Sequence, residues 1–175
     1  DYDEGLRRSS GSHDDPDSAS RAIEAGAGEF LYRVEWELKD LRPGSGGEPG
    51  AWLVFADESG VGRELEAALS RQGAGAIVVS SGASYERPDG NHFRVRPGSR
   101  EDIDRLLNEV GEGLQGVVHL WSLDAAPPRE TTVDSLQNAQ LLGTASVVAL
   151  VQSLAGRSSR TPPRIWLVSS AVQST

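Results

Sequence analysis

The stretch AWLVFADESGVGRELEAALSRQGAGAIVV, residues 51–79, decides the fold of this chain. Residues 51–56 are a short continuous apolar run, which predicts a strand buried on both faces. Residues 60–72 predict an amphipathic helix, and the glycine-rich turn after them ends it. The apolar side chains of this helix recur at helical spacing, at Val61, Leu65, Ala68 and Leu69. Residues 76–79 predict a second buried strand, which completes a strand–helix–strand unit of a parallel sheet.

The rest of the chain continues this alternation of strands and helices. Short apolar runs predict strands at residues 92–95, 116–121 and 165–168. Alternating strands and helices predict an α/β fold with a Rossmann-like parallel sheet flanked by helices.

Two further helices are expected between these strands. Ser99, followed three residues later by Asp102, resembles a capping box with aspartate in place of glutamate, and it opens a helix to about residue 110. A long helix is predicted over residues 134–154. Its apolar seam is expected at Leu141, Ala145, Val148 and Val151.

The amino-terminal part differs in composition from the α/β unit. Residues 1–28 are rich in Ser, Asp, Gly and Arg, and are expected to form a flexible interdomain linker, with a natural disordered tail as the alternative. Residues 30–38, FLYRVEWEL, alternate apolar and polar side chains and predict a strand. One domain is therefore expected over residues 29–175.

Composition excludes several classes of function. The net charge of −9 argues against a nucleic-acid surface. The absence of cysteine excludes a thiolate nucleophile, and three scattered histidines do not have the spacing of a metal site. The longest apolar stretches are shorter than the roughly 20 residues of a membrane helix, so no membrane contact is expected, and a cytoplasmic setting is the simplest.

The first strand–helix turn is where a dinucleotide would bind. When the turn is aligned with the short-chain dehydrogenase pattern TGxxxGxG, Gly60 and Gly62 match the last two glycines, but Ala56 stands in place of the first. Two acids, Asp57 and Glu58, also stand within the turn. Two unit charges about 4 Å apart interact by roughly 4 kcal/mol at an effective dielectric near 20, more than the 0.3–1 kcal/mol that a helix terminus typically offers an anion. The acids are therefore interpreted as stabilising an empty helix terminus. This degenerate loop comprises Ala56, Asp57, Glu58, Gly60 and Gly62, and no cofactor-binding residue is predicted.

The remaining residues that a reductase needs are also missing. Residues 79–82, where a ribose-reading group would stand, offer neither a carboxylate nor an arginine. Lys39 is the only lysine, and no Tyr-x-x-x-Lys pair exists. Ser169 and Ser170 follow the last strand, where a catalytic serine would stand, but are interpreted as polar residues at a strand end. No catalytic or metal-binding residue is predicted.

The histidines are not expected to act as bases. His119 lies in an apolar strand and is interpreted as a hydrogen-bonded core or interface residue. His92, His119 and Asp124 can be drawn as a triad, although no spacing argument supports one.

Four segments together resemble one family. They are FLYRVEWEL, GVVHLWSLD at residues 116–124, LQNAQLLGTASVVALVQSL at residues 136–154, and PRIWLVSSAVQ at residues 163–173. Over about residues 29–175, the chain resembles the structural subdomain of a ketoreductase from a bacterial modular type I polyketide synthase.

The resemblance implies a noncatalytic half that supports a catalytic half, with NADPH bound by that second half and not by this chain. It implies that the subdomain is incomplete at its carboxyl end. A truncated pseudo-ketoreductase beside a methyltransferase, dehydratase or enoylreductase domain fits equally well. The parent would act on a β-ketoacyl group carried by an acyl carrier protein. Two alternatives stay open, namely part of an active NADPH-dependent reductase and a free-standing nucleotide-binding module.

Overall fold

The computed structural model describes Glu37, residues 50–157 and residues 162–170. Internal contacts divide the chain into two units, residues 1–42 with Thr175, and residues 43–174. The linker predicted over residues 1–28 lies outside the described residues, as does the strand predicted over residues 30–38 apart from Glu37. The following description therefore concerns the second unit.

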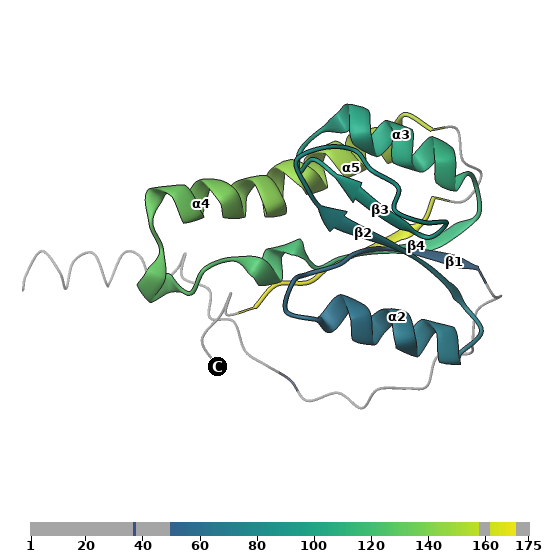
Figure 1. Cartoon of the computed structure of the whole chain (residues 1–175), viewed down its shortest axis with the longest axis horizontal. Coiled ribbons are helices and arrows are strands. Elements are labelled where there is room, and N and C mark those ends of the chain that lie inside the picture. Colours follow the sequence, from purple (N-terminus) through teal and green to yellow (C-terminus); the bar gives the residue numbers. More distant parts are fainter. Residues whose placement is uncertain (1–36, 38–49, 158–161, 171–175) are drawn as a thin grey trace, which may run out of the picture. The chain divides into compact units, whose positions relative to one another are not determined.

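Five parallel strands form one sheet in the order β3-β2-β1-β4-β5 (Figure 1). The chain moves outward from β1 in one direction to β3 and then crosses back to place β4 on the other side of β1. The strands lie where the apolar runs predict them, which confirms the Rossmann-like fold. They are β1 (Ala51–Phe55), β2 (Gly75–Ser81), β3 (His92–Val95), β4 (Leu114–His119) and β5 (Arg164–Leu167).

Helices cover both faces of the sheet (Figure 1). One face is covered by α2 (Val61–Arg71), and the other by α3 (Arg100–Val110) and α5 (Ser146–Ala155). A π-helical turn, η3 (Leu141–Ala145), joins α5 to the preceding α4 (Val133–Gln140). Two short 3-10 turns, η1 (Trp121–Asp124) and η2 (Pro128–Glu130), connect β4 to α4, so Trp121 lies beyond the strand predicted to include it.

The predicted seam of the long helix is wrong. Leu141, Val148 and Val151 are 46–49% exposed, so they do not face the core. The buried face consists of Leu142, Ser146, Ala149, Leu150 and Ser153. The helix carries apolar residues on both faces, so periodicity alone could not select the inner one. Ser146 and Ser153 lie on the inner face, and these polar residues interrupt the apolar spacing that would have identified it.

The same helix also differs from the expectation about membranes. By length and composition alone, Val133–Ala155 is long and apolar enough to cross a membrane, with a mean hydropathy of 1.2. However, the inner face of α5 packs in the main core beside α3, as a core helix of a folded domain does.

The capping box predicted at α3 is only half formed. The Ser99 hydroxyl accepts a hydrogen bond from the Asp102 backbone N–H at 3.3 Å. The Asp102 carboxylate does not reach back to Ser99. It accepts from the backbone N–H of Arg96 at 2.9 Å and from the Arg96 guanidinium at 2.6 and 2.9 Å. These bonds to Arg96 hold the pKa of the buried Asp102 below its usual range, although burial acts in the opposite direction.

Candidate functional site

The carboxyl ends of β1 and β4 lie side by side where the strand order reverses, which is the ligand position of doubly wound folds. The turn from β1 to α2, residues 56–60, borders this position. Gly60 has a φ of 108°, a left-handed conformation that favours glycine, and it forms the N-cap of α2. The backbone of this turn therefore resembles that of a nucleotide-binding loop, with a left-handed glycine just before the helix.

The amino terminus of α2 is already occupied by a carboxylate of the chain itself. Asp57 Oδ2 accepts hydrogen bonds from the backbone N–H groups of Gly60 at 3.0 Å and Val61 at 3.2 Å. Asp57 Oδ1 accepts from the N–H of Gly62 at 2.7 Å, and the Ser59 hydroxyl also donates to this carboxylate. These are the backbone donors that a phosphate group would need. The interpretation of an acid stabilising the helix terminus is confirmed for Asp57.

Asp57 is suited to this role as an anion. Its side chain is buried, which on its own would raise the pKa of the carboxyl group. The hydrogen bonds from Ser59, Gly62 and Val61 outweigh this effect and lower the pKa below its ordinary value. The group therefore stays negatively charged at neutral pH, when its repulsion of a second anion is strongest.

Glu58, the other acid of the turn, is placed differently from Asp57. It is exposed, and its backbone N–H donates a hydrogen bond to Asp124 Oδ1 at 2.9 Å. Burial, together with the nearby charges of Asp57 and Glu58, raises the pKa of Asp124, against the effect of the backbone hydrogen bonds. Sequence reasoning named Asp124 only as part of a possible triad and missed its contact with this turn, because η1 brings it from 66 residues away.

The second glycine of the loop, Gly62, has a packing explanation. This glycine is buried, and a Cβ there would stand 2.5 Å from the Cβ and 2.8 Å from the Cα of Ala56. Close contact between the first turn of α2 and the end of β1 therefore requires glycine, with or without a nucleotide.

Residues 79–82 themselves contain no arginine, but the structure brings one against them from the neighbouring strand. Arg94, on the neighbouring β3, lies against Gly82, where a Cβ would meet its Cγ and Cδ atoms. A guanidinium here is the group that accommodates the additional phosphate of NADP in related folds. However, Arg94 Nη1 is paired with Glu86 Oε2 at 2.9 Å. Sequence spacing missed Arg94 because it comes from the adjacent strand.

The three residues drawn as a triad do not form one. His92 contacts Asp89 and Glu66 at the beginning of β3. His119 is buried on β4, and its Nε2 lies 2.9 Å from Ser146 Oγ on α5. Because the Ser146 hydroxyl is directed at the carbonyl oxygens of Leu142 and Gly143, it accepts the proton of His119 Nε2. His119 is thus a hydrogen-bonded core residue that fixes α5 beside the π-helical turn.

Ser169 and Ser170 are exposed after β5. Ser169 lines a shallow groove together with Thr144 and Leu167, and no described side chain is hydrogen-bonded to it there. Its position agrees with the predicted strand end but does not assign it a role.

Buried His119 should make stability depend on pH. Burial lowers its pKa from 6.5 to about 4, so protonation in this range favours the unfolded chain. The stability that neutral His119 contributes to the folded chain is fully present above pH 6.5, and it is lost as the pH falls from 6.5 toward 4. We expect the free energy of unfolding to fall by about 2 kcal/mol between pH 7 and pH 5.

Urea unfolding at these two pH values checks this prediction. His119→Gln can still donate to Ser146 but has no titratable group, so it should lose most of the difference. His92→Gln should keep it. An equal pH dependence in the His119→Gln variant and the unmodified chain would contradict the assignment.

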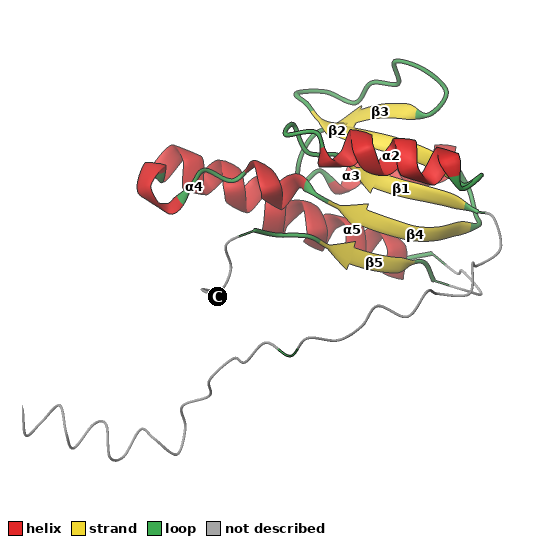
Figure 2. Ribbon diagram, turned by 90° about the horizontal axis from the view of Figure 1, so that it is seen from below, coloured by secondary structure: helices red, strands yellow, loops and turns green. Residues whose placement is uncertain are grey.

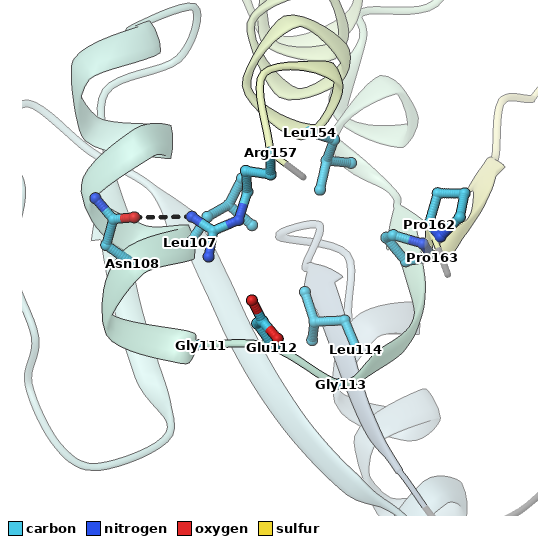
Figure 3. Close-up of a pocket in the computed structure, with 10 residues that line it drawn as sticks. All are labelled: Leu107, Asn108, Gly111, Glu112, Gly113, Leu114, Leu154, Arg157, Pro162 and Pro163. Atoms are coloured by element: carbon cyan, nitrogen blue, oxygen red, sulfur yellow. Dashed lines mark hydrogen bonds between the residues drawn. The ribbon is translucent and has the colours of Figure 1, made fainter. Parts of the chain in front are cut away.

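A pocket of about 320 Å³ lies at the opposite end of the sheet, near the amino ends of β4 and β5 (Figure 3). In it, Arg157 Nη1 donates to Asn108 Oδ1 at 2.8 Å, and Glu112 supplies the one carboxylate. Ligands of doubly wound folds bind at the carboxyl ends of the strands, so this pocket does not occupy the nucleotide position. Among the described residues, no group of histidine, aspartate and glutamate side chains is arranged to hold a metal ion.

Fold and loop together define the class: a Rossmann-type α/β domain whose first strand–helix turn is hydrogen-bonded to its own aspartate. The chain belongs to the family described as beta-ketoacyl synthase-like, N-terminal, which matches residues 50–171. This match and the solved structures below confirm the resemblance to synthase ketoreductases. No curated protein matches the chain.

Solved structures of similar fold include ketoreductases of assembly lines. One is a keto acid-selecting NRPS module with adenylation, ketoreductase and pseudo Asub domains, at 22% identity and a TM-score of 0.64, covering 75% of this chain and 11% of that one. Another is an N-terminal ketoreductase from the macrolactin assembly line, at 19% identity and a TM-score of 0.58, covering 69% and 25%. A short-chain dehydrogenase/reductase from Vibrio parahaemolyticus has 17% identity and a TM-score of 0.50, covering 67% and 61%. The chain thus spans about a tenth and a quarter of the first two relatives.

Proposed function

We propose that this chain is the noncatalytic structural half of a polyketide synthase ketoreductase, and that it supports a catalytic half or a neighbouring synthase domain in the cytoplasm. The observation that carries the proposal is that the Asp57 carboxylate accepts hydrogen bonds from three backbone N–H groups at the start of α2. A domain that fills its phosphate position with its own carboxylate is built to keep its fold without a nucleotide.

The surroundings of the ribose position support the same conclusion, because the arginine there is already paired with Glu86. Reduction of a β-ketoacyl group on an acyl carrier protein, with NADPH as the hydride donor, would then belong to residues of another half. The alternative of an active reductase differs only in whether such a half is present in the parent protein.

Titration with NADPH separates this proposal from the free-standing nucleotide-binding module. The four tryptophans provide an intrinsic fluorescence signal. We expect no saturable change up to millimolar NADPH, after correction with free tryptophan amide for absorption by the nucleotide. Saturable binding in the micromolar range would show that the Asp57 carboxylate can be displaced, and the proposal would fail.

A further inference from the structure

The pocket at the amino ends of β4 and β5 takes no part in the function proposed above. It is bordered by the carboxyl ends of α3 and α5, which pack together on the face of the sheet away from α2 (Figure 2). Its volume of about 320 Å³ is at the lower end of the range for small-molecule sites. The pocket therefore has the size for one small molecule rather than for a dinucleotide.

One wall of the pocket is apolar. Leu107 belongs to the main core, and Leu114 and Leu154 pack against it, so core packing holds these side chains in place. Pro162 and Pro163 complete the wall with rigid rings that have no backbone N–H. This wall suits an apolar group that packs against a fixed surface.

The pocket also carries two opposite charges that do not neutralise each other. Arg157 Nη1 donates to Asn108 Oδ1 at 2.8 Å, and this neutral amide leaves the guanidinium without a counter-ion. Glu112 supplies the carboxylate, and within the described residues neither Arg157 nor Glu112 forms an ion pair. Figure 3 shows both side chains bordering the same space, with no hydrogen bond between them. The pocket thus presents one cation and one anion to a ligand.

The ends of α3 and α5 add negative potential to the pocket. The last carbonyl groups of a helix have no intrahelical partner and form the negative end of its dipole. Neither helix has a basic residue in its last turn to offset this end. Arg157, just beyond α5, balances part of the negative potential, and Glu112 adds to it. An ammonium group is therefore favoured near Glu112, and a carboxylate is favoured at the remaining donors of Arg157.

We propose that this pocket binds a free α-amino acid with an apolar side chain. The ligand carboxylate accepts hydrogen bonds from the Arg157 guanidinium, whose planar donors match a carboxylate. The ligand ammonium group donates to Glu112 and to carbonyl oxygens at the helix ends, and the ligand side chain packs against the apolar wall. A simple amine would leave the Arg157 charge without a partner. A simple carboxylic acid would be repelled by the net charge of −9, whereas a zwitterion is neutral.

Isothermal titration calorimetry of the whole chain with L-phenylalanine tests the proposal. We expect saturable binding with a Kd at or below about 1 mM. The analogue 2-phenylethylamine lacks the carboxylate, and 3-phenylpropionate lacks the ammonium group, so each should bind at least about tenfold more weakly. L-Serine keeps both charged groups but has no apolar side chain, and it should also bind at least about tenfold more weakly.

Two isosteric or near-isosteric variants assign the charged groups of the pocket. Arg157→Gln should weaken L-phenylalanine binding at least about tenfold without weakening the binding of 2-phenylethylamine. Glu112→Gln should weaken L-phenylalanine binding to a similar degree without weakening the binding of 3-phenylpropionate. Arg71→Gln is the matched control, because Arg71 also lies at the end of a helix but belongs to α2. Urea unfolding confirms that each variant is folded before it is titrated.

Amide chemical shifts locate the ligand, and those of Gly111, Glu112 and Gly113 should move with the same saturation as the heat of binding. No saturable binding of L-phenylalanine up to about 10 mM would overturn the proposal, as would binding that both variants leave intact or shifts confined to another part of the chain. Equal or tighter binding of either analogue would overturn it in favour of a simple acid or a simple amine. The pocket and the Asp57 turn lie at opposite ends of the sheet, so this proposal and the proposed function can fail separately.

Discussion

Replacing Asp57 with alanine is expected to lower the free energy of unfolding by about 3 kcal/mol. The carboxylate satisfies the backbone N–H groups of Gly60, Val61 and Gly62 and the hydroxyl of Ser59. Alanine leaves all of these donors without their acceptor, and it removes a negative charge from the positive end of the α2 dipole. Chemical denaturation of the purified chain at neutral pH measures this loss.

Glu58→Ala is the matched control for Asp57→Ala, because it removes the adjacent acid from the same turn. Glu58 is exposed, and the interaction of this residue with Asp124 uses only its backbone N–H. Its replacement should change stability by less than about 0.5 kcal/mol. Equal losses in the two variants would mean that the acids act only through their summed charge and that the hydrogen bonds of Asp57 contribute little.

Replacing Gly62 with alanine is expected to cost about 3 kcal/mol, although alanine is the better helix former by about 1 kcal/mol. The added Cβ would stand 2.5 Å from the Ala56 Cβ and 2.8 Å from the Ala56 Cα. Because Ala56 directly follows β1 and its Cα belongs to the backbone, the clash is relieved only by moving α2 away from the sheet. Thermal or urea unfolding detects the loss.

Gly90→Ala is the control for crowding at Gly62, since nothing lies within 4 Å of a Cβ at Gly90 and its φ is not in the left-handed region. We expect Gly90→Ala to stay within about 0.5 kcal/mol of the unmodified chain. If Gly62→Ala proved as stable as Gly90→Ala, this glycine would need another explanation, and a ligand that approaches the backbone would be the first to consider.

The sheet could be predicted from sequence because its strands are apolar runs bounded by glycines and polar turns. Such runs are short, and the structure places all five strands where they were expected. Burial is concentrated in β1, β2 and β4, whereas every residue of the edge strand β5 is exposed. The inner face of the long helix could not be predicted, because Leu141, Val148 and Val151 compete with Leu142, Ala149 and Leu150 for the same pattern. Only packing against α3 and the sheet selects between the two faces.

The loop was predictable in kind but not in its contacts. The lost first glycine and the two acids are visible in the sequence, yet nothing local distinguishes Asp57, which is buried, from Glu58, which is exposed. Asp124 and Arg94 reach the site from other strands or turns, so spacing along the chain could not place them there. Residues that meet only through the parallel sheet are the part of such a site that a single sequence hides.

Amide chemical shifts of Gly60, Val61 and Gly62 provide the most direct measurement of the central claim, which is that Asp57 holds the position of a phosphate. Because hydrogen bonds lower the pKa of Asp57, these three amides should shift together only as the pH falls below about 3.8. At neutral pH they should not shift when NADPH is added to millimolar concentration. Saturable shifts of the same three amides with NADPH at neutral pH would contradict the claim.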